Sequence, residues 1–200
     1  MGTRGCYGFR INKHDKVTYN PFDSYPKELG YKLMCFVAQT QVSAMERIAR
    51  RIKLVDRNSI PPRDLIVKYK KYADLSVSEQ KYEDWYCLLR KTQGDLGVYR
   101  DDLEHMIDDS EFLDDSLFCE WAYIINLDTS QLEAYRGFNK NPSANGRYAH
   151  ESVENSKGYF GVELIKEIEL TKIDEDNITN YIRELESITG YGVSTTRNPK

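Results

Sequence analysis

Strand-like patterns occur at both ends of this chain, and helix-like patterns fill the region between them. Short runs of β-branched and aromatic residues, separated by polar turns, are typical of β-hairpins. Because such strands bury their apolar faces in a shared sheet, the two ends of the chain are expected to meet in one antiparallel sheet. The expected strands span residues 7–11, 17–20, 120–128, 132–138 and 159–173.

The middle of the chain follows the helical period instead. Apolar residues recur every three or four positions, which predicts amphipathic helices. The expected helices span residues 28–41, 45–55, 64–72 and 82–89, a short acidic stretch within 99–117, and a last helix that Asp174 begins.

We therefore predict an α+β fold, in which an antiparallel sheet built from the N- and C-terminal strands has a helical middle segment packed on it. A length of 200 residues suits one domain. This domain is expected to span residues 1–190, with a helical insertion at about 28–117, and residues 191–200 are expected to form a polar C-terminal tail.

Charge is distributed unevenly along the chain, whose net charge is −4. Residues 1–73 hold 15 Lys and Arg against 6 Asp and Glu, a balance of +9, whereas residues 74–200 hold 13 against 26, a balance of −13. Two complementary halves that pack on each other explain this best, and a basic surface for an anionic partner is the alternative.

The basic stripe at residues 47–53 is interpreted as a solvated helix face. No nucleic-acid-binding module is recognisable, so nucleic acid is not expected as a partner.

The four cysteines, at positions 6, 35, 87 and 119, lie too far apart for a zinc motif, and we expect no metal and no cofactor.

Neither a secretory signal nor an apolar run of membrane-spanning length is visible. We therefore predict a cytoplasmic protein that does not contact membranes. Its fifteen tyrosines are expected at the boundary of the core or, alternatively, at the edge of a groove or interface, because each ring buries apolar area while its hydroxyl needs a partner.

The first 31 residues are unusually rich in glycine, arginine and aromatic residues. Arg4 offers a planar set of donors for a carboxylate or phosphate, and Asp23 lies in a loop bracketed by two prolines. The two side chains either pair with each other or face a ligand. Arg136 ends a predicted strand before a long loop, as a residue in a site wall would. The predicted ligand-binding residues are Thr3, Arg4, Asp23, Tyr25 and Arg136.

Catalytic machinery is hard to assemble from this sequence. The histidines at 14, 105 and 150 are isolated, and no nucleophile, phosphate-loop or zinc-protease motif is present. We therefore assign no catalytic residue. One covalent alternative remains, in which Cys6 or Thr3 acts as an N-terminal nucleophile of a hydrolase or an amidotransferase-like enzyme.

The opening residues resemble a group of proteins from phages, bacteria and fungi that begin M-[GS]-T-R-[GS] and then carry a motif close to Y-x-H-W-D-[GS]-Y-P. The matching segments are Met1-Gly-Thr-Arg-Gly5, Tyr19, Asp23-Ser-Tyr-Pro26 and Leu29-Gly30, and residues 121–128 and 132–138 are similar to the group's later hairpin. The group implies no established activity. This chain has Pro21-Phe22 where the group has His-Trp, which favours binding over catalysis.

The sequence thus predicts an intracellular binding or interaction protein, whose partner is a small anion or another protein. The site is expected around the N-terminal Thr3-Arg4-Gly5 strand and the loop at 22–26. The alternatives are the N-terminal-nucleophile enzyme and a self-associating structural protein, which would form a homo-oligomer.

Overall fold

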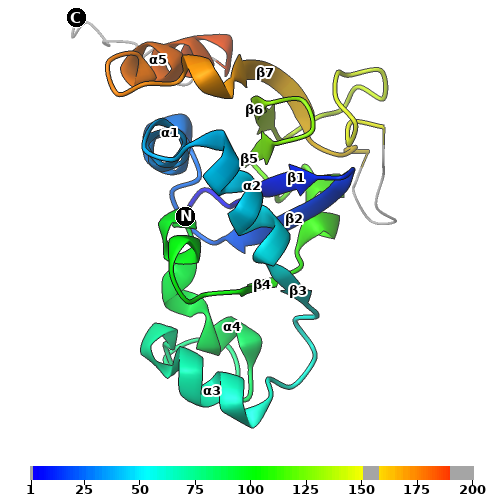
Figure 1. Cartoon of the computed structure of the whole chain (residues 1–200). Helices are drawn as coiled ribbons and strands as arrows, with labels where there is room; N and C mark the ends of the chain where they lie inside the picture. The colour runs from blue at the N-terminus through cyan, green and yellow to red at the C-terminus, as the bar shows by residue number, and fades with distance from the viewer. Residues whose placement is uncertain (1, 151–157, 190–200) are drawn as a thin grey trace, which may run out of the picture.

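The computed structural model describes residues 2–150 and 158–189, and its central feature is a five-stranded sheet with the order β2-β1-β5-β6-β7 (Figure 1). The expected α+β class, with a sheet drawn from both ends of the chain, is confirmed. All neighbouring strands run antiparallel except β1 and β5, which are parallel. The long helical segment between β2 and β5 permits this, because parallel neighbours need a long connection. The strands are β1 (Gly5–Ile11), β2 (His14–Asn20), β5 (Trp121–Asn126), β6 (Gln131–Arg136) and β7 (Glu163–Glu169).

The first hairpin closes through a two-residue turn at Asn12 and Lys13. Both residues have positive φ, at 53° and 64°, which matches the twist of a tight hairpin. The Asp128 carboxylate accepts hydrogen bonds from both of their backbone N–H groups at 2.7 Å. This contact joins the β1–β2 turn to the β5–β6 turn and fixes one end of the sheet.

The helices are shorter than the sequence pattern predicts. A π-helical turn at Pro26–Gly30 leads into α1, and single 3₁₀ turns connect most of the later elements. The expected helix at 82–89 contains only the four residues of α4. Asp84 fixes its start by accepting from the Tyr86 N–H at 2.8 Å, and a 3₁₀ turn follows its end. The helices are α1 (Tyr31–Ala38), α2 (Val42–Arg51), α3 (Arg63–Tyr69), α4 (Trp85–Leu88) and α5 (Ile178–Thr189), and the 3₁₀ turns are Lys70–Tyr72, Arg90–Thr92, η4 (Leu96–Arg100), η5 (Ser110–Asp114) and Leu170–Lys172.

Two predictions in the middle segment are wrong. The expected helix at 45–55 ends at Arg51, and its last residues form β3 (Lys53–Val55). The expected acidic helix within 99–117 contains instead β4 (His105–Ile107), which pairs in parallel with β3. Both segments are three residues long, so the helical and strand periods cannot be told apart there. Pairing with a distant segment decides the outcome.

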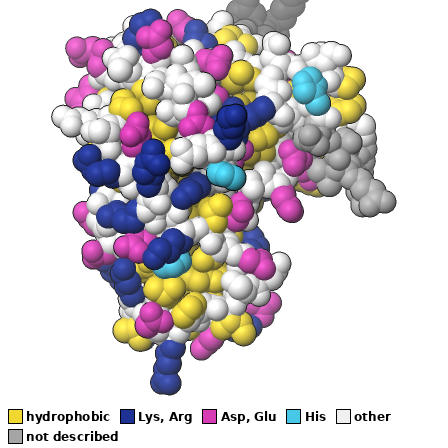
Figure 2. All heavy atoms as spheres, turned by 45° about the vertical axis from the view of Figure 1, so that its right-hand side comes forward, with side chains coloured by type: hydrophobic (Ala, Val, Ile, Leu, Met, Phe, Trp, Pro, Cys, Tyr) yellow, Lys and Arg dark blue, Asp and Glu magenta, His cyan; other side chains and the backbone are white. Residues whose placement is uncertain are grey.

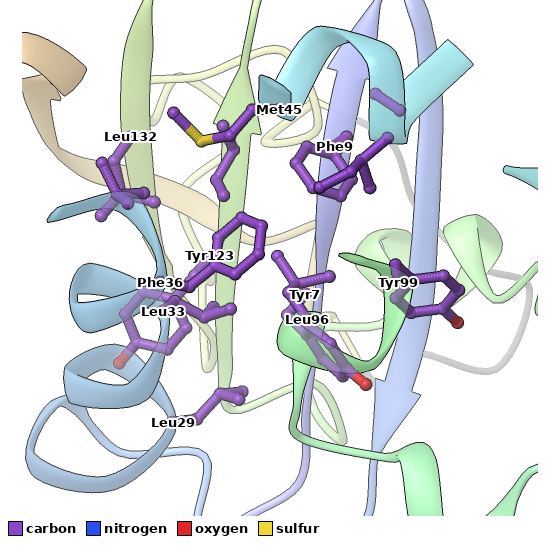
Figure 3. Packing of buried hydrophobic residues seen from close by; sticks show 14 of the residues in the cluster. Tyr7, Phe9, Leu29, Leu33, Phe36, Met45, Leu96, Tyr99, Tyr123 and Leu132 are labelled. Carbon is purple, nitrogen blue, oxygen red and sulfur yellow. The ribbon is translucent and has the colours of Figure 1, made fainter. Parts of the chain in front are cut away.

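One face of the sheet carries the main core. Aromatic side chains of β1 and β5 form much of this face, where Phe9 and Tyr123 point toward α1 and α2 (Figure 3). The Tyr7 hydroxyl instead donates to the Thr92 carbonyl at 3.1 Å. Phe9 meets Phe36 of α1 edge-on, with ring centroids 6.1 Å apart. Full burial of rings of this size is the main source of stability here.

Below the sheet lies a small lobe that contains β3, β4, α3 and α4 (Figure 1). Its buried residues, including Tyr69, Trp85 and Met106, belong to the same continuous core as the sheet residues. The lobe thus continues the domain rather than forming a separate core. None of the helices in the described ranges is both long and apolar enough to cross a membrane. The predicted tail at 191–200 and part of the predicted loop, 151–157, lie outside the described residues.

Candidate functional site

The opening segment packs directly on the proline-bracketed loop. Ser24 is fully buried, and its N–H donates to the Thr3 carbonyl at 3.1 Å. Asn20 donates a side-chain hydrogen bond to the Ser24 hydroxyl at 2.8 Å. A side chain at Gly5 would collide with the Trp121 carbonyl and with Ser24. Thr3 is itself buried. The small residues Thr3, Gly5 and Ser24 thus occur where the opening segment and the loop approach each other closely.

Asp23 and Tyr25 lie on the outer part of this loop. Asp23 is exposed, has a φ of 54° and accepts a hydrogen bond from the Tyr25 hydroxyl at 2.7 Å. No ion pair joins Asp23 to Arg4 within residues 2–150 and 158–189. The expected pair of Arg4 with Asp23 is therefore not formed.

Arg136 is fixed at the end of β6. Its guanidinium lies 4.7 Å from the Trp121 ring centre and donates to the Glu120 carbonyl at 3.2 Å. Trp121 belongs to the core on the helix-covered face of the sheet.

Arg4 immediately precedes Gly5, so strand alternation directs its side chain to the other face, together with Cys6. The structure does not bring the five predicted residues into one site.

Arg4 lines a pocket of about 390 Å³, which we call the Arg4 pocket. Its walls come from β2, α4, η5 and two loops of the middle segment. The Tyr19 ring meets the Phe112 ring edge-on at 5.3 Å and lies 6.5 Å from the Tyr86 ring. The lining residues are Arg4, Tyr19, Arg57, Tyr86, Asp109 and Phe112, which do not include Thr3, Asp23, Tyr25 or Arg136.

Asp109 organises the Arg4 pocket. One carboxylate oxygen accepts from Arg57, at 2.6 Å from Nη2 and 3.2 Å from Nε. The other accepts from the Tyr19 N–H at 2.9 Å and from the Thr18 hydroxyl at 3.2 Å. The Asp109 side chain is only 9% exposed. Its charge and its acceptor capacity are therefore largely used within the protein.

The two arginines of the Arg4 pocket differ in their surroundings. The Arg57 guanidinium is held by Asp109 and lies 4.8 Å from the Tyr86 ring centre. The Arg4 guanidinium lies 4.7 Å from the Phe118 ring centre, and it makes no hydrogen bond or ion pair with any described residue. Two guanidinium charges and one carboxylate leave the lining with a balance of +1.

Tyr19 can act as a hydrogen-bond donor in the Arg4 pocket. Burial raises the pKa of its hydroxyl above the ordinary value, and the Tyr86 hydroxyl adds to this shift. The nearby Arg4 and Arg57 charges oppose the shift without reversing it. The Tyr19 hydroxyl therefore stays protonated near neutral pH.

Most of the Arg4 pocket was not predictable from the sequence. Arg57, Tyr86, Asp109 and Phe112 come from the middle segment, where no motif distinguishes them. The abundance of tyrosine was the one available signal, since it predicts rings at a groove edge. Only the fold shows which rings these are.

A second polar cluster lies on the same face of the sheet as Arg4. Arg147 donates to both oxygens of Glu133, at 2.8 and 2.5 Å, and the Glu133 side chain is only 3% exposed. Asn126 and the Tyr135 hydroxyl donate to the same carboxylate at 2.7 and 3.0 Å. Each Glu133 oxygen thus accepts two hydrogen bonds from within the protein. We interpret this cluster as a structural network.

The residues that could support covalent chemistry are separated. Cys6 is fully buried within β1, and burial raises the pKa of its thiol well above the ordinary value. The His105 ring shares a 2.8 Å hydrogen bond with the Tyr69 hydroxyl in the lower lobe. The described part of the chain contains no group of three or more His, Cys, Asp or Glu that could hold a metal ion. This geometry gives the N-terminal-nucleophile hypothesis no support.

Comparison of this chain with protein-family models, with curated proteins and with solved structures found no match. A function is therefore inferred from the geometry of the Arg4 pocket.

Proposed function

We propose that this protein binds a small organic anion with a planar group in the Arg4 pocket. One observation carries the proposal. The Arg4 guanidinium lines the pocket with no anionic partner among the described residues, beside an arginine whose charge is already balanced by Asp109.

The anionic part of the ligand follows from this charge balance. A guanidinium offers five N–H donors in a planar arrangement that matches a carboxylate or phosphate. The Arg4 guanidinium donates to no acceptor among the described residues, whereas Arg57 uses two of its donors to bind Asp109. An anion that reaches Arg4 would neutralise the balance of +1.

The planar part of the ligand follows from the walls. Tyr19, Tyr86 and Phe112 surround the same space, and aromatic rings favour stacked or edge-on contacts with other rings. A volume of about 390 Å³ lies within the range of small-molecule sites. A monocyclic or bicyclic ring with one acidic group fits these limits.

Isothermal titration calorimetry with paired probes tests this proposal. Phenyl phosphate and adenosine 5′-monophosphate each combine a ring with an anion, whereas inorganic phosphate and adenosine each supply one part only. We expect the combined probes to bind at least about tenfold more tightly than either part, because one pocket satisfies both. Equal or absent binding of all four probes contradicts the proposal.

Arg4 variants locate the site. Arg4→Gln removes the charge and is expected to weaken binding at least about tenfold. Arg4→Lys keeps the charge but loses the planar geometry, so its affinity is expected to lie between those of the wild-type protein and Arg4→Gln. Arg63→Gln, an exposed arginine outside the pocket lining, serves as the control. Unchanged affinity in Arg4→Gln, with the fold intact by circular dichroism, would place the ligand elsewhere.

The two alternative functions stay predictions. Intact-mass measurement tests the N-terminal-nucleophile enzyme, because that hypothesis requires a mature chain that begins at Cys6 or Thr3. Light scattering over a salt series tests the self-associating protein, because charge-driven association weakens as salt rises. A monomer at every salt concentration contradicts it.

A further inference from the structure

Three arginines surround a second pocket, of about 590 Å³, between the end of α1, the outer face of α2 and η4. We call it the triple-arginine pocket. Its charged lining residues are Arg47, Arg51 and Arg100, and no Asp or Glu of the described ranges lines it. Polar side chains of Gln39, Thr40 and Gln41 complete part of the wall. It shares no residue with the Arg4 pocket.

Two of these arginines are held in place by the fold. Arg100 donates to the Thr40 hydroxyl at 2.7 Å, and its guanidinium lies 4.8 Å from the Phe36 ring centre. Arg51 donates to the Tyr99 carbonyl at 2.5 Å. Each contact uses one of five N–H donors and leaves the others for a ligand. Fixed guanidinium groups lose less conformational entropy when an anion binds.

The three arginines of the triple-arginine pocket are not paired with carboxylates in the described part of the chain. Arg47 and Arg51 also lie four positions apart on α2, where like charges repel. By contrast, Arg10 pairs with Asp15 and Arg147 with Glu133.

Basic side chains are frequent on one face of the molecule. Figure 2 shows Lys and Arg side chains gathered along one side of the molecule, with carboxylates scattered among them. The N-terminal 73 residues, which supply Arg47 and Arg51, carry the +9 balance of the sequence.

We propose that the triple-arginine pocket binds a ligand with two or more adjacent phosphate groups. Three guanidinium groups around one space match a multiply charged anion better than a single carboxylate, and arginine forms paired hydrogen bonds with phosphate oxygens. The pocket accepts the phosphate chain itself. This proposal does not rest on the function assigned to the Arg4 pocket.

Calorimetric titration of the full chain with inorganic tripolyphosphate and with inorganic phosphate tests the inference. We expect tripolyphosphate to bind at least about tenfold more tightly, and its affinity to fall as salt rises, because three arginines contribute together. Equal affinity of the two probes, or no binding of tripolyphosphate at low salt, overturns the proposal.

Variants on a single helix separate a site from general charge attraction. Arg47→Ala removes a side chain that has no ion-pair partner among the described residues and is expected to weaken tripolyphosphate binding at least about tenfold. Arg50→Ala removes the same charge from α2 outside this pocket lining and should change the affinity less than about twofold. Equal losses in both variants would mean diffuse attraction only and overturn the proposal.

The Arg4→Ala variant separates the two pockets. It is expected to leave tripolyphosphate affinity within about twofold of the wild-type value, because Arg4 lies outside the triple-arginine pocket. A large loss in Arg4→Ala without a loss in Arg47→Ala would assign tripolyphosphate to the Arg4 pocket and refute the inference.

Discussion

Arg57 donates two hydrogen bonds to a single oxygen of Asp109, although the two residues lie 52 positions apart in the chain. Their contact connects the loop after β3 to the loop after β4, and Asp109 in turn binds the backbone of Tyr19 in β2 at 2.9 Å. The ion pair therefore attaches the lower lobe to the edge of the main sheet. It also balances one of the two positive charges of the Arg4 pocket, and no second carboxylate is among the described lining residues.

Asp109→Asn is expected to lower the free energy of unfolding by about 2 kcal/mol or more. The change removes the charge that Arg57 faces, and charge-assisted hydrogen bonds contribute about 1.5–3 kcal/mol each. Urea denaturation measures the loss. Glu111→Gln, an exposed residue nearby, should change stability by less than about 0.5 kcal/mol. Similar small effects in both variants would show that Asp109 does not hold the lobe in place.

Gly5→Ala is expected to destabilise the protein by about 1–3 kcal/mol or more, because the added methyl group has no space beside the Trp121 carbonyl and Ser24. Gly158 offers a comparison, because its φ is +79° and a methyl group added there would meet no atom within 4 Å. Gly158→Ala should cost only about 1 kcal/mol, from backbone strain alone. Thermal unfolding of both variants distinguishes them, and a Gly5→Ala protein as stable as Gly158→Ala contradicts the close approach.

Glu133 and Arg147 are expected to depend strongly on each other. Glu133→Gln or Arg147→Met alone leaves a polar partner without its match in a mostly buried site, which costs about 3–5 kcal/mol. The double variant should lose at least about 1 kcal/mol less than the sum of the single losses.

The exposed pair of Glu169 and Lys172, 2.9 Å apart, is the control for this cycle. Its coupling should stay within about 0.5 kcal/mol, because solvent screens it. A Glu133–Arg147 coupling as small as this would show that the cluster is not the structural network that we infer.

Acid is expected to destabilise the lower lobe through His105. Burial, and next the Lys53 charge, lower the pKa of this side chain below the ordinary value of 6.5. Lys68 acts in the same direction, whereas Glu104 and Asp64 oppose it. Below pH 6.5 the unfolded chain binds the proton more readily, so stability falls as the pH drops toward the folded pKa and is retained above 6.5.

Urea denaturation at pH 7.5 and pH 5.5 measures this dependence. His105→Gln should show a smaller loss between the two pH values than the wild-type protein, whereas His14→Gln, which removes an exposed histidine, should keep the full loss. An unchanged pH dependence in His105→Gln would assign the acid sensitivity to other groups.

The local elements were predictable where one period dominates over enough residues. The hairpin from Gly5 to Asn20 and the strands after Trp121 follow from alternating apolar residues and polar turns, and the fold class follows from their places at the two ends of the chain. The strand at His105–Ile107 was not predictable, because a three-residue segment has no period and gains its structure only by pairing with Lys53–Val55.

The order of residues alone was enough to place Arg4 in an opening segment rich in glycine, arginine and aromatic residues, and to predict that strands from both ends of the chain form one sheet. It was not enough to show that Arg4 faces Tyr19 and Arg57 rather than Asp23, which follows from the folded chain. The reason is physical. The partners of Arg4 come from segments that long-range packing alone brings together, whereas Asp23 binds the Tyr25 hydroxyl within its own loop.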